Sequence, residues 1–124
     1  KIRLGHFIGQ EDHEYGDVSP INKNVAEPGM IFSIEPGIYI EGSHGVRLEN
    51  ELLVCEGEKN EYGEFLYFEP ITYVPFDLDA INPDIMNAED KERLNTYHAT
   101  VYEKVSPYLN DEEKEWLKKY TRAI

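Results

Sequence analysis

The stretch SIEPGIYIEGSHGVRLENELLV, residues 33–54, decides the fold, because it reads as two β-strands joined by a short turn. Its strands extend over 30–40 and 45–54, and both are rich in β-branched and aromatic residues. The segment EGSHG between them supplies the small and polar residues of a turn. The stretch therefore predicts an antiparallel hairpin.

The apolar residues of this hairpin indicate its register. Pairing about Gly42 places Ile38 opposite Val46, so that apolar side chains match across the strands. The same register sets Glu35 opposite Glu49, where Cβ atoms lie about 4.5–5.5 Å apart and like charges are destabilising. The hairpin thus raises the question of what offsets the repulsion between these two acidic side chains.

The rest of the first part of the chain predicts strands and connections. A third strand is expected over FLYFEPITYVPF, residues 65–76, where Pro70 favours an edge position or a strand end. The polar segment EGEKNEYGE, residues 56–64, is interpreted as a loop, and 77–87 as an irregular connection.

After residue 87 the apolar period becomes helical. Asn87 is a good N-cap, and Pro107 marks the end of the first predicted helix. Asn110 can cap a second helix over 111–124, with acids in its first turn and bases in its last. The sequence predicts an α+β fold with a strand-rich part over 1–76 and a helical extension over 77–124.

Composition limits the partners. The chain has 124 residues, with 25 acidic and 12 basic side chains and a net charge of −13. An acidic surface repels nucleic acid and anionic membranes, so neither is expected as a partner, whereas a cation is compatible with it. The single cysteine, Cys55, allows no internal disulfide and favours a reducing, cytoplasmic location.

The opposed acids have two interpretations. Spacing alone favours a solvated strand face carrying Glu35, Arg47, Glu49 and Glu51. The alternative is a divalent-metal site, because clustered carboxylates are what such ions bind and one carboxylate can bridge two of them. Residues outside the hairpin are needed to decide between the two.

Those residues lie upstream, in GHFIGQEDHE, residues 5–14. This segment, with a His-Glu pair seven residues after His6, resembles the "pita-bread" metallopeptidases, the family of methionine aminopeptidase, prolidase and aminopeptidase P. EPGIY at 35–39 and GVRLEN at 45–50 resemble the same family's two glutamate motifs, in the family's order. The segment from Tyr67 to Leu117 resembles the C-terminal extension of the longer Xaa-Pro aminopeptidases.

The resemblance implies roles for individual residues. His6 and Glu35 match ligands of one metal ion, and Glu49 matches the glutamate that bridges two. Arg47 shares a strand face with Glu49 and is expected to hold a ligand carboxylate. His13 matches a histidine that contacts the substrate, and is expected to donate a hydrogen bond to the scissile carbonyl. The implied cofactors are two divalent ions, with manganese first and cobalt, zinc and iron as alternatives.

The implied function is hydrolysis of the Xaa-Pro bond at the N-terminus of peptides whose second residue is proline. Two features depart from the family. Its two aspartate ligands precede the GH motif, whereas no Asp precedes His6 here, and Ile2 stands where prolidases and aminopeptidases P usually carry His. The chain is therefore interpreted as the C-terminal part of a catalytic domain, inactive by itself. A creatinase-like hydrolase and a non-catalytic binding module stay open as alternatives.

Two further expectations concern the helices. Tyr97, Val101, Tyr102, Trp116 and Tyr120 offer more apolar surface than two short helices need, which predicts a homodimer with these helices at or near its interface. His98 borders the apolar stripe of the first helix and is interpreted as a packing residue.

Overall fold

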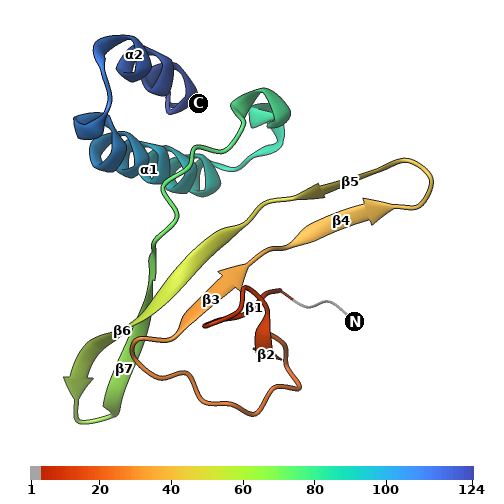
Figure 1. Ribbon diagram of the computed structural model, residues 1–124, viewed down its shortest axis with the longest axis vertical. Coiled ribbons are helices and arrows are strands. Elements are labelled where there is room, and N and C mark those ends of the chain that lie inside the picture. The colour runs from red at the N-terminus through yellow and green to blue at the C-terminus, as the bar shows by residue number, and fades with distance from the viewer. Residues whose placement is uncertain (1–3) are drawn as a thin grey trace. The chain divides into compact units, whose positions relative to one another are not determined.

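The structure is a computed structural model that describes residues 4–124, apart from the side chain of Tyr15 (Figure 1). Ile2 lies outside the described residues, so its departure from the family pattern stays a matter of sequence. The chain forms two compact units, Lys1–Thr72 and Tyr73–Ile124. The boundary between the two units lies after residue 72, four residues before the boundary that the sequence suggested after residue 76.

The described part of the first unit, residues 4–72, is built from two antiparallel sheets. The larger sheet has five strands in the order β2-β1-β3-β6-β7, and the smaller pairs β4 with β5. The strands are β1 (His6–Ile8), β2 (Glu14–Asp17), β3 (Ile31–Ile34), β4 (Gly37–Ile40), β5 (His44–Arg47), β6 (Asn50–Asn60) and β7 (Gly63–Pro70). Antiparallel sheets together with the two helices of the second unit confirm the predicted α+β class.

The predicted hairpin has the expected register. Ile38 pairs with Val46 in the small sheet, and the turn is centred on Gly42, whose φ of +71° suits glycine. Each predicted strand is nevertheless broken, because β3 ends at Ile34 before β4 begins and β5 ends at Arg47 before β6 begins. Pro36 lies between β3 and β4 and has no N–H to donate to a strand ladder, which explains the break in the first predicted strand.

The prediction of a loop over 56–64 is wrong. β6 continues to Asn60 and β7 begins at Gly63, which leaves a two-residue turn that Gly63 closes with a φ of +140°. An ion pair between Lys59 and Glu64 joins the two strands beside the turn. The segment looked like a loop because both strands are exposed here and carry polar side chains. β7 is the edge strand and ends at Pro70, earlier than expected.

Few side chains of the first unit are buried. Among residues 4–72, whose burial is described except at Tyr15, Phe32 and Val54 are the buried large apolar residues, and Ser33 is fully buried. The ring of Phe32 lies 4.4 Å from that of Phe7 and 6.1 Å from that of Phe68, so aromatic contacts join β1, β3 and β7.

The second unit contains two α-helices and three short 3₁₀ turns. They are η1 (Leu78–Ala80), η2 (Pro83–Ile85), α1 (Ala88–Val105), η3 (Ser106–Tyr108) and α2 (Asp111–Tyr120). The predicted N-caps are confirmed, since Asn87 accepts from the Asp90 N–H at 2.8 Å and Asn110 forms a capping box with Glu113. No helix in the described part of the chain is long and apolar enough to cross a membrane.

The core of the second unit contains Leu78, Leu94, His98, Val101 and Leu117. Val101, which the sequence assigned to an intermolecular surface, is therefore used inside the unit. Trp116 is 57% exposed and lies against Tyr120 with 4.5 Å between ring centroids. The apolar surface left for a partner is smaller than the sequence suggested, because helix packing takes part of it.

Candidate metal centre

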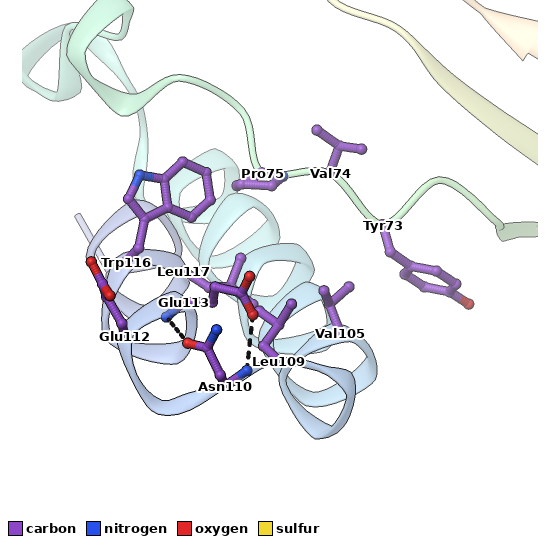
Figure 2. Close-up of a pocket in the computed structure, with 10 residues that line it drawn as sticks. All are labelled: Tyr73, Val74, Pro75, Val105, Leu109, Asn110, Glu112, Glu113, Trp116 and Leu117. Atoms are coloured by element: carbon purple, nitrogen blue, oxygen red, sulfur yellow. Dashed lines mark hydrogen bonds between the residues drawn. The ribbon is translucent and has the colours of Figure 1, made fainter.

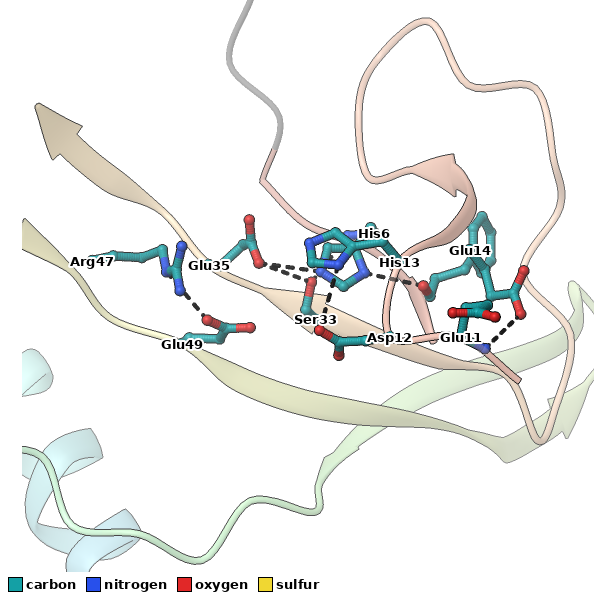
Figure 3. A network of polar contacts seen from close by, with 10 residues as sticks. His6, Glu11, Asp12, His13, Glu14, Ser33, Glu35, Arg47 and Glu49 are labelled. Atoms are coloured by element: carbon teal, nitrogen blue, oxygen red, sulfur yellow. Dashed lines mark hydrogen bonds and ion pairs between the residues drawn. The ribbon is translucent and has the colours of Figure 1, made fainter. Parts of the chain in front are cut away.

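The three predicted ligands come together in the first unit. One ligand atom each from His6, Glu35 and Glu49 can be chosen so that all three lie within 4.8 Å of one another (Figure 3). All three residues are partly buried. The predicted opposition of the two acids is thus present, with an imidazole beside them.

The breaks in the hairpin position the two acids. Glu35 lies between β3 and β4, and Glu49 lies between β5 and β6, where the strands leave one sheet and enter the other. At this junction the Glu35 N–H donates to the Leu4 carbonyl at 2.7 Å, outside the hairpin. That bond ties the chain before β1 to the junction, and β1 then brings His6 alongside.

Gly5 permits this close approach. A Cβ atom on Gly5 would lie 1.7 Å from the carbonyl oxygen of Ser33, which no side chain could tolerate. The next residue, His6, donates its main-chain N–H to the Ser33 hydroxyl at 3.0 Å. The Gly-His pair therefore has a local structural reason, because only glycine lets the ligand strand lie this near to β3.

The hydrogen bonds of His6 determine which nitrogen faces the acids. Its Nδ1 lies 3.0 Å from the Phe7 carbonyl, and a carbonyl can only accept, so Nδ1 carries a proton. In the neutral ring Nε2 then carries the free lone pair, and Nε2 lies 3.3 Å from a Glu35 oxygen. An imidazole oriented by a backbone carbonyl is the arrangement typical of a metal-binding histidine.

Ser33 is a functional candidate that the sequence reasoning missed. It is fully buried, accepts from His6, and donates its hydroxyl to Glu35 at 3.4 Å. It therefore touches two of the three predicted ligands. The signal was a lone small polar residue in an apolar strand, two positions before Glu35 and hence on the same face.

Arg47 contacts Glu49, the third candidate ligand. Its Nε lies 3.2 Å from a carboxylate oxygen of Glu49. The Glu49 carboxylate, with smaller contributions from the Tyr39 hydroxyl and Glu35, raises the pKa of Arg47 above its ordinary value. The guanidinium thus stays charged and can orient Glu49 by a charge-assisted bond.

His13 lies beside the cluster. Its ring stacks on that of His6 with 4.1 Å between centroids, and Asp12 contacts it at 3.4 Å. The His13 side chain is 73% exposed, so it is open to solvent on the side away from His6. The two histidines border a pocket of about 440 Å³, which Glu14 and Asp17 also line.

The donor set suits a divalent cation of the first transition row. One neutral imidazole nitrogen and two carboxylates match the ligand preferences of manganese, iron, cobalt and zinc. The residues present therefore fit such an ion. Among residues 4–124, no aspartate joins this cluster.

The geometry is thus that of an antiparallel fold whose sheet junction could hold a divalent metal ion on an imidazole and two carboxylates. Two family models match the chain. Residues 1–56 match the metallopeptidase family M24, and residues 64–124 match the C-terminal region of peptidase M24. The chain belongs to metallopeptidase family M24, and its fold is the C-terminal portion of the pita-bread fold.

Curated relatives are Xaa-Pro aminopeptidases. Xaa-Pro aminopeptidase 2 of Homo sapiens is 37% identical over 97% of this chain and 19% of its own length. Aminopeptidase P1 of Arabidopsis thaliana is 38% identical over 97% of this chain and 20% of its own length. The chain spans about a fifth of the length of these relatives.

A solved structure has the same fold. The X-prolyl aminopeptidase of Caenorhabditis elegans, described as a cytosolic enzyme with a di-nuclear active site, superposes with a TM-score of 0.80. It is 25% identical, and the match covers 98% of this chain and 21% of that one.

Proposed function

We propose that this chain is the C-terminal part of the catalytic domain of a metal-dependent Xaa-Pro aminopeptidase. The complete polypeptide would release the first residue of peptides that have proline second. The observation that carries the proposal is the convergence of His6, Glu35 and Glu49 within 4.8 Å, in a chain whose relatives are named Xaa-Pro aminopeptidases.

The residues of the junction would hold two divalent ions, with manganese as the first choice. His6 and Glu35 would bind one ion, and Glu49, which faces both His6 and Glu35, would be shared between the two. The remaining ligands would come from outside this chain, because the described residues bring no aspartate to the cluster. When bound, such a pair supplies an acidified water and polarises the scissile carbonyl.

The other side chains would orient the ligands and the substrate. Ser33 holds His6 and Glu35 in relation to each other, and Arg47 holds Glu49. His13, exposed beside His6, is placed to donate a hydrogen bond to the substrate carbonyl as negative charge develops on it. The stacked His6 ring limits how far His13 can turn.

We also propose a cytoplasmic homodimer. The C. elegans enzyme is described as cytosolic, and the exposed Trp116 provides an anchor of the kind that protein interfaces use. Light scattering of the complete polypeptide at micromolar concentration tests the association. A wild type that scatters as a clean monomer would contradict the homodimer. A dimer whose mass Trp116→Ala leaves unchanged would contradict the role of Trp116.

The experiment that tests the activity compares matched carboxylate variants of the complete polypeptide. With manganese added, the wild type should release the first residue from an Xaa-Pro peptide and leave creatine intact. Glu49→Gln should lose at least about a hundredfold in kcat/KM, a barrier increase of about 2.7 kcal/mol. Glu41→Gln, which changes an exposed acid in the hairpin turn, should retain full activity.

Two results would refute this assignment. One is unchanged turnover in Glu49→Gln, and the other is turnover by the 124-residue chain alone, which would mean that no ligand is needed from elsewhere. Creatine turnover in place of peptide turnover would instead identify a creatinase-like hydrolase.

A further inference from the structure

His98 lies in the second unit and is fully buried on α1. Its Nε2 accepts the main-chain N–H of Phe76 at 3.0 Å. Its Nδ1 is also buried and has no hydrogen-bond partner among the described residues. The bond from the Phe76 N–H is therefore the contact that fixes the role of the His98 ring as an acceptor.

The accepting nitrogen determines the protonation state. A ring that accepts at Nε2 must be neutral, with its single proton on Nδ1. Burial lowers the pKa of His98, the nearby backbone of Arg122 opposes this, and the positive charge of Arg122 lowers it further. The net effect is a lowered pKa, which agrees with the accepting Nε2 and indicates a neutral ring in the folded state.

The hydrogen bond that His98 accepts from Phe76 holds residues 74–76, which follow the boundary between the two units. The preceding residue of α1, Tyr97, donates its hydroxyl to the Val74 carbonyl at 2.8 Å, and its ring lies 5.2 Å from that of Phe76. Residues 74–76 are thus tied to α1 through two adjacent side chains. Val74 and Pro75 in turn line a pocket of about 630 Å³ that Trp116 of α2 also lines (Figure 2).

We propose that His98 is an acid-sensitive latch, in which the neutral imidazole fastens residues 74–76 to α1 and the protonated imidazole releases them. Imidazolium is a donor at both nitrogens, so it cannot accept the Phe76 N–H. Release would leave that N–H and two ring N–H groups in need of water, which favours an opened segment.

The charges around the latch oppose protonation of the closed form. Arg122 faces the imidazole from the segment after α2, and it also contacts Asp79 of η1 at 3.3 Å. The aromatic neighbours Phe76 and Tyr97 carry no charge that would stabilise imidazolium at neutral pH. Protonation therefore has to accompany opening.

The direction of the pH effect follows from linkage. In the opened segment the imidazole meets water and its pKa returns to about 6.5, whereas the closed form has a lower pKa. The open form then binds more protons, so opening is favoured as the pH falls below about 6.5 and is unaffected above it. Between pH 7.5 and 5.5 the opening constant should rise by up to about tenfold.

Hydrogen exchange of the complete polypeptide, followed by mass spectrometry at pH 7.5 and 5.5, tests the latch. After correction for intrinsic exchange, peptides within 73–80 should lose up to about tenfold in protection at pH 5.5. His98→Gln should abolish this pH-dependent loss of protection, because the glutamine amide oxygen can accept the Phe76 N–H but does not titrate. His44→Gln, which replaces an exposed histidine in the first unit, should leave the loss unchanged.

Three outcomes would overturn the latch. They are equal protection of 73–80 in the wild type at both pH values, an unchanged pH-dependent loss in His98→Gln, and a loss shared equally by peptides from α2. The first and third are read from the wild type alone, so they decide the matter even if His98→Gln does not fold.

Discussion

At the scale of single residues, the junction of the two sheets brings charge and hydrogen bonding together within a few side chains. Glu35 and Glu49 repel each other, and a free imidazole lone pair on His6 faces Glu35. A cation among them turns each of these unfavourable contacts into a favourable one. In the proposed centre, Ser33 and Arg47 would hold Glu35 and Glu49 in place as ligands.

Ser33→Ala should weaken both folding and metal binding. It leaves the main-chain N–H of His6 without its acceptor, which costs about 1–3 kcal/mol in the free energy of unfolding. It also frees Glu35, and loss of such an orienting contact typically lowers metal affinity about 10–100-fold. Denaturation in the presence of a chelator measures the first effect, and metal titration measures the second.

Ser43→Ala provides the matched control for this variant. It removes a serine hydroxyl from the exposed hairpin turn, so both stability and metal affinity should stay near those of the wild type. If Ser33→Ala behaved like Ser43→Ala in the metal titration, Ser33 would have no part in orienting the ligands.

At the scale of elements, α2 depends on its N-terminal cap. The side chain of Asn110 accepts from the Glu113 N–H at 3.0 Å, and the Glu113 carboxylate accepts from the Asn110 N–H at 2.9 Å. Asn110→Ala should therefore destabilise the second unit by about 1 kcal/mol. Chemical denaturation measures this, with Glu112→Gln as a control that keeps both capping bonds. Equal losses in the two variants would show that charge, and not the cap, stabilises this helix end.

The elements that the sequence predicted well are those with local signals. The hairpin register follows from apolar pairs such as Ile38 with Val46 and from the glycine turn, and both helix starts follow from Asn87 and Asn110. Such signals depend on neighbouring residues, so they can be recognised in a sequence without knowledge of the fold.

The elements that the sequence missed depend on distant contacts. The sequence of 56–60 predicts a loop because its side chains are polar and exposed, and only pairing with β7 makes it a strand. The role of Ser33 becomes visible only when β1 lies beside β3, and the same contact explains Gly5. Likewise, the predicted packing role of His98 omits its bond to Phe76, 22 residues away in the chain.

At the scale of the whole molecule, the proposed function makes this chain the carrier of part of a metal centre. Three candidate ligands converge within the first unit, and no aspartate among residues 4–124 joins them. The relatives are about five times longer than this chain, so a polypeptide of that length would have room to supply the remaining ligands. The large exposed side chains of β4 and β7 are consistent with surfaces that other parts of such a polypeptide would cover.

One measurement separates a metal centre from a mere cluster of charges. The complete polypeptide is stripped with chelator, loaded with Mn²⁺, dialysed and assayed for metal per chain, in the wild type, Glu49→Gln and Glu41→Gln. If Glu49 is shared between the ions, the wild type and Glu41→Gln should retain about two ions per chain, and Glu49→Gln at most about one. Retention of both ions by Glu49→Gln, or of none by the wild type, would contradict the assignment of His6, Glu35 and Glu49 as ligands.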